Sequence, residues 1–364
     1  MNLTKRSISI SQLLSVFVVM LFTPSVRMLP SASSATASHA SWLTPIPALL
    51  PAIILLLCLS YVYKPFLSQR PSLCTIITNI MGNIAGKIIL WFSFGLIILI
   101  AALELRFYGE RVTTLMYYDI PYYIMIFFFS IVLLLVVKKG LSSSIRLCQV
   151  VSTIVVTTFF LTFLFSLGNI KTDYVLPITT MDIVPIATGS ISSLSLLSFI
   201  LILFFLSDYV NDLEKMKKRS IIVVSILTFL FMLVIFVCAG ILGPVLTARM
   251  PYPYLVSVKM IRLFQSLERI ESIVSAVTII SDFALIIMLI FSAVNILKHL
   301  LSLKHSLLIA NIIIMLVYIL SIFIGVSKLE LESFSSLIIQ PLFIIFAFGL
   351  VFSLMLVGKL RKKI

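Results

Sequence analysis

The chain has 364 residues, of which 61% are hydrophobic and only 11% are charged. An ordinary soluble domain has roughly 25% charged residues, and a chain of this length cannot bury so much apolar surface in a soluble fold. The composition therefore excludes a soluble enzyme, a disulfide-rich secreted domain and a disordered chain. It predicts an all-α, polytopic membrane protein whose environment is the lipid bilayer.

Apolar stretches of about 20 residues, the length that a helix needs to cross a bilayer, recur along the whole chain. The connections are short, so we expect a single transmembrane domain over residues 1–364, without a loop large enough to hold a soluble active site. Ten transmembrane helices are predicted, at 8–29, 43–63, 84–107, 117–137, 146–168, 183–207, 219–242, 270–297, 306–326 and 334–357.

The distribution of Lys and Arg predicts the orientation of these spans. The net charge is +14. With the N-terminus inside, the inner segments carry two thirds of the 27 basic residues, as cytoplasmic loops of membrane proteins do. We therefore interpret the positive charge as a determinant of topology and not as a nucleic-acid surface. Both termini are expected to be cytoplasmic, as an even number of spans requires.

The N-terminal region allows a second interpretation. Lys5 and Arg6 precede an apolar stretch, and small residues follow at 31–40, a pattern similar to that of a cleaved signal peptide. Cleavage would leave nine spans and would break the alternation of basic and non-basic segments. The interpretation with ten spans explains more of the sequence.

Ten spans prompt a search for an inverted repeat of two five-span halves, 8–168 and 183–357. The first span of each half contains prolines, hydroxyl residues or glycine that favour a broken helix. Such breaks persist in a membrane where the freed backbone groups face protein or a wet cavity, and they then bind ligands. A simple proline kink is the alternative. The predicted pocket residues are Phe22, Thr23, Pro24 and Ser25 from span 1 and Ala187, Thr188, Gly189 and Ser190 from span 6.

Asp282 lies near the middle of the predicted span 270–297. A carboxylate at that depth costs ~2.5–3.5 kcal/mol on insertion scales. We therefore expect it to face the bundle interior, either protonated or paired. Its role is either proton or cation coupling or a structural hydrogen bond to a neighbouring helix.

Further charges lie near the predicted outer end of span 3. Arg106 and Glu110 are four residues apart and can pair on one helix face. Together with Glu104 and Tyr108, they form either a solvated helix end or part of an outer gate. The charged segment 267–271 is interpreted as a set of interfacial salt bridges at the start of span 8.

No catalytic or cofactor motif is present in the sequence. The three histidines are isolated, and the four cysteines (Cys58, Cys74, Cys148 and Cys238) lack metal-binding spacing. The sequence contains neither of two common glycine-rich phosphate-binding motifs, GxxxxGK(S/T) and GxGxxG. We therefore expect neither enzymatic activity nor a metal or other cofactor.

Three sequence blocks resemble the spore germination permease family, the B-type membrane subunit of germinant receptors. ISISQLLSVFVVMLFTPSVRMLP at 8–30 is similar to the opening helix of that family, and Ser41-Trp42-Leu43 opens the second span in a similar way. GILGPVLTARMPYPYLVSVKMIRLFQSLERIES at 240–272 resembles the family's tyrosine–proline loop and the basic helix that follows it. The resemblance covers nearly the full length of the chain.

This resemblance implies the LeuT-like fold of the amino acid/polyamine/organocation superfamily. It also implies a receptor subunit in the spore inner membrane or cell membrane that senses a small germinant, typically an amino acid. The partners would be an A-type membrane subunit and a C-type lipoprotein. The sequence departs from the superfamily in two places: residues 22–25 contain no glycine, and no acidic residue precedes Trp42. An autonomous secondary transporter of an amino acid or organic cation is the alternative function.

Overall fold

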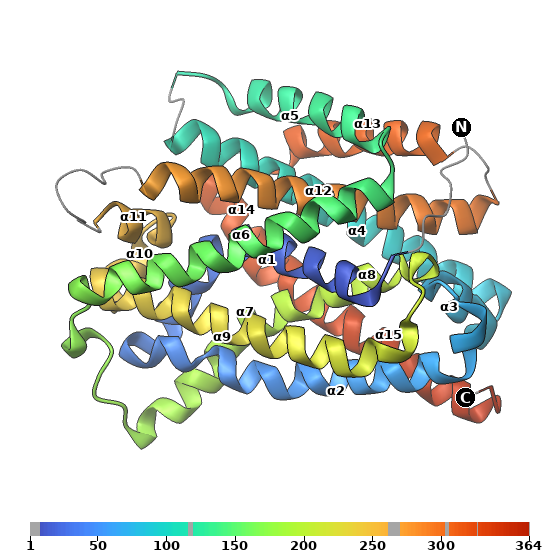
Figure 1. Cartoon of the computed structure of the whole chain (residues 1–364), viewed down its shortest axis with the longest axis horizontal. Coiled ribbons are helices and arrows are strands. Elements are labelled where there is room, and N and C mark those ends of the chain that lie inside the picture. Colours follow the sequence, from blue (N-terminus) through green and yellow to red (C-terminus); the bar gives the residue numbers. More distant parts are fainter. Residues whose placement is uncertain (1–7, 116–118, 261–269, 303–305, 326, 364) are drawn as a thin grey trace.

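The computed structural model describes residues 8–115, 119–260, 270–302, 306–325 and 327–363 (Figure 1). Within these ranges nearly all regular structure is helical, and the one β-bridge pairs Ile8 with Val210. The helices are α1 (Ile10–Ala37), α2 (Pro45–Tyr63), α3 (Leu73–Met81), α4 (Asn83–Leu115), α5 (Tyr122–Val137), α6 (Leu141–Ser166), α7 (Ile183–Ser198), α8 (Ile200–Phe204), α9 (Met216–Leu242), α10 (Pro244–Arg249), α11 (Pro253–Lys259), α12 (Ile270–Leu301), α13 (Ser306–Phe323), α14 (Lys328–Phe334) and α15 (Gln340–Leu360).

Nine segments of the described chain are helical, long and apolar enough to cross a membrane, and they match nine of the ten predicted spans. The protein is thus a multi-pass, all-helical membrane protein. The predicted span 117–137 corresponds to α5, which has 16 residues and a length of about 24 Å, less than the ~30 Å of a bilayer core. Residues 116–118 lie outside the described residues. The count of ten stays a prediction.

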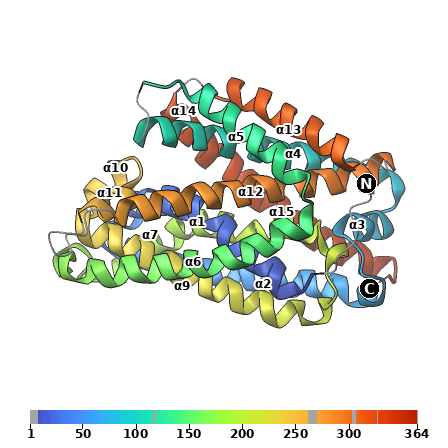
Figure 2. The same cartoon turned by 45° about the horizontal axis from the view of Figure 1, so that its top comes forward.

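Helix α1 occupies the centre of the bundle. It contacts α6, α7, α9, α10 and α12, and most of its side chains are buried. Helices α5 and α13 pack together against α4 on one flank, whereas α2 and α9 lie on the opposite flank (Figures 1 and 2). A helix that is apolar on every face is suited to this central position.

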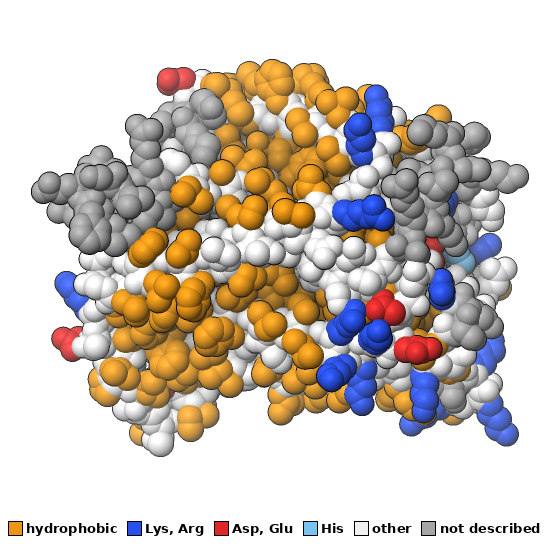
Figure 3. All heavy atoms as spheres, viewed as in Figure 1, with side chains coloured by type: hydrophobic (Ala, Val, Ile, Leu, Met, Phe, Trp, Pro, Cys, Tyr) orange, Lys and Arg blue, Asp and Glu red, His pale blue; other side chains and the backbone are white. Residues whose placement is uncertain are grey.

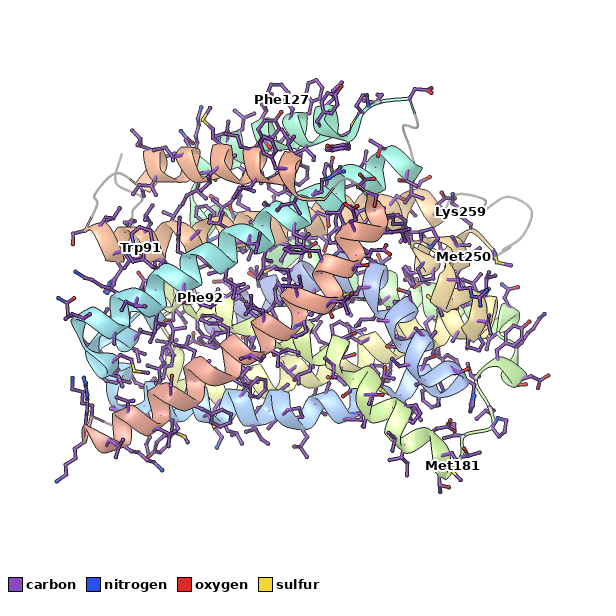
Figure 4. All side chains as sticks on the ribbon, turned by 180° about the vertical axis from the view of Figure 1, so that it is seen from behind. Trp91, Phe92, Phe127, Met181, Met250 and Lys259 are labelled. Carbon is purple, nitrogen blue, oxygen red and sulfur yellow. The ribbon has the colours of Figure 1, made fainter. Side chains whose placement is uncertain are left out.

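The two ends of the bundle differ in charge. Helix α1 begins and α15 ends at the same end (Figure 1), and Lys and Arg side chains gather over it (Figure 3). The short helices α10, α11 and α14 lie at the opposite end. Between the ends the surface is largely apolar, and exposed side chains such as Trp91, Phe92 and Phe127 point outward from the bundle (Figure 4). That belt fits the hydrocarbon region of a bilayer.

Span 6 is interrupted, but the position that the sequence predicted for this helix break is wrong. Residues 187–190 are helical, and α7 begins at Ile183, so Pro185 lies in the first turn. Proline is tolerated there because the N–H that it lacks has no partner inside the helix. The helix is instead interrupted at Phe199, between α7 and α8.

The predicted break in span 1 is also wrong, because α1 remains helical through residues 22–25. The neighbouring helix α12 supports α1 at this point. The Thr23 amide donates to Ser281 Oγ at 3.1 Å, and the Ser281 hydroxyl in turn donates to the Val19 carbonyl. The Thr23 hydroxyl donates to the Thr278 carbonyl at 2.8 Å. A side chain that enters the hydrogen-bond ladder in this way accommodates the irregularity next to Pro24 without unwinding the helix.

Candidate functional site

Glu104 forms a buried ion pair that joins α4 to α1. The two guanidinium nitrogens Nη1 and Nη2 of Arg27 donate to its two carboxylate oxygens at 3.0 and 2.9 Å. The Arg27 guanidinium also lies over the ring of Phe107, 3.7 Å from the ring centroid. Both charged side chains are buried. A bidentate pair of this kind neutralises both charges and fixes the distance between the two helices.

Arg106 lies in the same part of α4 and is 1% exposed. It pairs with Glu110 at 2.7 Å, which confirms the pairing predicted from their spacing. Its guanidinium covers the ring of Tyr122, 3.2 Å from the ring centroid. The interpretation of this segment as a solvated helix end is therefore wrong, since α5 covers Arg106. Tyr108 stacks on Phe129 of α5, with ring centroids 4.1 Å apart.

Asp282 is buried and forms an ion pair with Arg111 of α4. The expectation of an inward-facing, protonated or paired carboxylate is confirmed in its paired form. Ser281, the residue before it, makes the hydrogen bonds to α1 described above. One turn of α12 therefore connects the ion pair on α4 with the proline-containing part of α1. Whether Asp282 takes part in coupling stays a prediction.

The eight residues of the predicted midplane pocket do not line any of the cavities described below. Thr23 and Ser25 are buried, and their hydroxyls donate to backbone carbonyls. Thr188 is exposed and donates to its own helix. Gly189 is closely packed: a Cβ atom there would lie 2.5 Å from Thr36 Oγ1 and 2.8 Å from Thr44 Cγ2. The glycine allows α7 to approach α1 and α2 and leaves no open space beside it.

A cavity of about 460 Å³ opens at the end of the bundle opposite the chain termini. Met250, one of its lining residues, lies at that end in Figure 4. Helices α1, α4 and α14 and the α10–α11 connection form its walls. The lining residues are Arg27, Met28, Ser31, Ala32, Ala35, Phe107, Thr114, Ala248, Arg249, Met250, Pro251, Tyr252, Lys328, Leu329, Glu332, Ser335, Ser336 and Gln340.

The local sequence explains how the α10–α11 connection reaches this cavity. Gly243, with φ +80°, ends α9 in a conformation that favours glycine. Tyr252 stands between Pro251 and Pro253 and has a left-handed backbone, with φ +53°. Its ring and hydroxyl are buried. Burial raises the pKa of the Tyr252 hydroxyl to about 12, so the group stays a protonated donor near neutral pH.

A second, smaller cavity of about 20 Å³ is lined by both members of the Arg27–Glu104 pair. Arg27 and Gln340 line both cavities, whereas Glu104 lines only the smaller one. The smaller space is large enough for one water molecule. It extends to Phe199, where α7 gives way to α8. The ion pair therefore stands between the open cavity and the interrupted helix.

The opposite end of the bundle has a different cavity, of about 180 Å³. Lys138, Lys139 and Lys298 line it, together with the start of α6. Of the charged segment 267–271, residues 267–269 lie outside the described residues, and Glu271 pairs with Lys259 at 2.8 Å. Among the described residues, no group of three His, Cys, Asp or Glu side chains is placed to hold a metal ion.

The sequence analysis did not identify Arg27, Tyr252, Lys328 or Gln340 as site residues. For Arg27 an indication was present, because a basic residue within span 1 and the acidic Glu104 within span 3 are both unfavourable in lipid unless they pair. Tyr252 lies in the tyrosine–proline block that was noted for its resemblance alone. Lys328 reaches the cavity only through the packing of α14 against the bundle.

The fold and the site define a helical membrane protein with a ligand-sized cavity at one end, lined in part by Arg27 of the buried Arg27–Glu104 pair. Residues 7–329 match the family model of the spore permeases, described as spore germination protein. Because the match covers most of the chain, the protein belongs to the spore germination permease family. This membership indicates a permease-like protein with a role in germination. A comparison with curated proteins finds no match.

Proposed function

We propose that the chain is the permease-like subunit of a germinant receptor, with ten transmembrane helices in a LeuT-like inverted repeat. Helix contacts support this arrangement. If α1 is equivalent to α7 and α2 to α9, the contacts α1–α9 and α2–α7 are symmetry equivalents, and both are present. The start of α1 and the end of α15 lie at the same end of the bundle, which supports an even number of crossings, with α5 as the tenth. The basic residues there support a cytoplasmic location for that end.

The germinant, an amino acid or a molecule of similar size, binds in the 460 Å³ cavity. Sites for small molecules have volumes of roughly 300–1,000 Å³ and combine apolar walls with a few polar groups. This cavity has both features, with Phe107, Met28 and Ala32 as apolar wall residues and Arg27 and Lys328 as charged ones. The single observation that carries the proposal is that Arg27, which lines this cavity, forms the buried pair with Glu104 that connects α1 to α4.

The test is a substitution that fills the cavity. Ala32→Phe adds a ring to the cavity wall and should raise the germinant concentration for half-maximal spore response by about tenfold or more, equivalent to ~1.4 kcal/mol of binding free energy. Ala187→Phe is the matched control, since Ala187 is exposed on α7 and lies outside the cavity. Protein abundance in the membrane should be normal for both variants. A shift for Ala187→Phe alone would instead support the midplane pocket between spans 1 and 6.

Signalling requires partners, which we propose to be an A-type membrane subunit and a C-type lipoprotein. The alternative function, autonomous secondary transport, requires the ligand to cross the membrane. Uptake of a labelled amino acid into sealed vesicles distinguishes the two functions. A receptor subunit should show no saturable uptake when it is reconstituted alone, whereas a transporter should show uptake without the partner subunits.

A further inference from the structure

Two hydrogen-bond donors on the wall of the 460 Å³ cavity have no acceptor among the described residues. They are the hydroxyl of Tyr252 and the ammonium group of Lys328, both buried at the atom level. The Lys328 ammonium lies over the Tyr252 ring, 3.8 Å from the ring centroid. Its closest carboxylate oxygen, on Glu332, is 3.7 Å away, beyond hydrogen-bond distance.

Buried donors of this kind are uncommon, because polar groups removed from water normally find a partner. A buried donor without an acceptor destabilises the protein, and an ammonium group does so more than a neutral one. The two residues that carry these donors come from different elements, α14 and the α10–α11 connection, and both line the cavity. A small shift of either side chain toward the cavity would let both donors bind an acceptor that enters it.

The backbone at Tyr252 is an independent observation. Aromatic residues rarely adopt a left-handed conformation, and such strain persists where the surroundings hold it, often at ligand sites. Here Pro251 and Pro253 flank Tyr252, and the constrained turn keeps the ring under Lys328. A relaxed turn would direct the hydroxyl elsewhere.

The charges that line the cavity also favour an anion. Arg27, Arg249 and Lys328 are basic, whereas Glu332 is the only acidic lining residue in the described part of the chain. Glu104 neutralises Arg27 from the side of the smaller cavity. Lys328 forms an ion pair with Glu332 at 3.7 Å, too long for a hydrogen bond, and both residues line the cavity.

We propose that Tyr252 and Lys328 bind the carboxylate group of the ligand, and that the cavity selects small carboxylates such as amino acids over their uncharged amides. The Lys328 ammonium supplies the charge, and the Tyr252 hydroxyl donates a second hydrogen bond to the same group. This inference rests on the proposed function, because it assigns a ligand group to the same cavity.

The first test measures the charge preference of the cavity without a germinant. Ser31 lines the cavity and is half-buried, so Ser31→Cys places a thiol in it. The full chain is placed in nanodiscs of uncharged lipid, and its thiol is labelled with one of two methanethiosulfonate reagents. The sulfonatoethyl reagent is anionic, and the trimethylammonioethyl reagent is cationic. Each rate is divided by the rate of the same reagent with a free thiol, because the cationic reagent is intrinsically the more reactive. By this measure the anionic reagent should be favoured, and Lys328→Met should lower the ratio of the two normalised rates by about tenfold. Labelling of the chain without the Ser31→Cys substitution measures the reaction of the native cysteines, and this rate is subtracted.

Matched controls separate the site from general charge effects. Lys259→Met removes a lysine outside the cavity that pairs with an acidic residue, Glu271, as Lys328 does with Glu332. It should leave the ratio of rates unchanged. Tyr252→Phe keeps the ring and removes the donor, so it should leave the charge preference largely intact but weaken protection by a carboxylate.

The second test uses protection of the Ser31→Cys thiol. Sodium acetate and the pooled protein amino acids other than cysteine should slow labelling, whereas acetamide and the corresponding pooled amides should not. Lys328→Met should abolish this protection, and Tyr252→Phe should weaken it severalfold. Equal protection by acids and amides, or protection that survives Lys328→Met, would overturn the carboxylate assignment. If Ala32→Phe still shifted the spore response, the cavity would remain the germinant site, and only this inference would fail.

Discussion

The two ends of the bundle use the same charged residue types in opposite ways. Near the cavity, Arg27 and Glu104 form a pair whose side chains are 7% and 8% exposed. At the other end, Arg219 and Asp212 form a pair at 3.1 Å whose side chains are 33% and 24% exposed. Water solvates the members of an exposed pair when they separate, so such a pair contributes little to stability. A buried pair has no such alternative, and each partner depends on the other.

The largest expected effect follows from removing one of the two charges of the buried Arg27–Glu104 pair. Glu104→Gln leaves the Arg27 guanidinium buried without a countercharge, and we expect a loss of ~3–5 kcal/mol in stability. Thermal unfolding of the chain in nanodiscs, followed by circular dichroism, measures it. The double variant Arg27→Met, Glu104→Met removes both charges and should recover most of the stability. A double variant as unstable as Glu104→Gln would show that packing, and not charge, dominates there.

The next effect concerns the hydroxyl that joins α12 to α1. Ser281→Ala leaves the Thr23 amide and the Val19 carbonyl without the partner that Ser281 provides, and each lost partner costs ~1–3 kcal/mol. Ser321→Ala is the matched control, because Ser321 is equally buried but donates only to its own helix. The same unfolding measurement should place Ser281→Ala clearly below the control. Equal stabilities would mean that α1 satisfies its own backbone groups at Pro24.

A third change tests the close approach of α7 to α1 and α2. Gly189→Ala forces a methyl group against Thr36 and Thr44 and should destabilise the protein by ~1–3 kcal/mol, as overpacking does. Gly95→Ala introduces the same methyl group on α4, where no atom lies within 4 Å. That control should be neutral or slightly stabilising, by ~0.5–1 kcal/mol. A neutral Gly189→Ala would show open space where the structure has contact.

The smallest effect belongs to an exposed ion pair. Glu271→Gln removes the partner of Lys259, whose side chain is 45% exposed, and should change stability by only ~0.2–1 kcal/mol. Added salt should reduce the difference further, since it screens exposed charges. Glu104→Gln should retain most of its effect in the same salt titration. If salt weakened both effects equally, the contrast between buried and exposed pairs would be wrong.

The spans could be predicted from the sequence because lipid imposes a length and an apolar composition on each helix. The pairing of Arg106 with Glu110 could also be predicted, since both residues lie on one helix face. The inward position of Asp282 followed from the energetic cost of a charge in lipid. These features depend on local sequence or on the properties of the bilayer.

Features that depend on the packing of distant segments could not be predicted. Arg111 and Asp282 are 171 residues apart in the sequence, and only the contact between α4 and α12 makes them partners. The two prolines of the predicted breaks show the same limit. Pro185 is harmless because α7 begins two residues before it, and Pro24 is accommodated because a serine from another helix lies beside it. A proline marks a weak point in a helix, but its neighbours decide the outcome.

A turn of π-helix at Ser335–Ile339 joins α14 to α15 and contributes residues to both the large and the small cavity. Such a turn holds one residue more than the corresponding α-helical turn. Because the π-turn takes up this extra residue, deletion of one residue there would restore a continuous α-helix and leave α15 nearly in phase with α14. Gln340, whose amide contacts Met28 of α1, would then keep its place in the cavity wall. In evolutionary terms, a single codon could be gained or lost at this turn while the residues that line the cavities and every membrane crossing are retained.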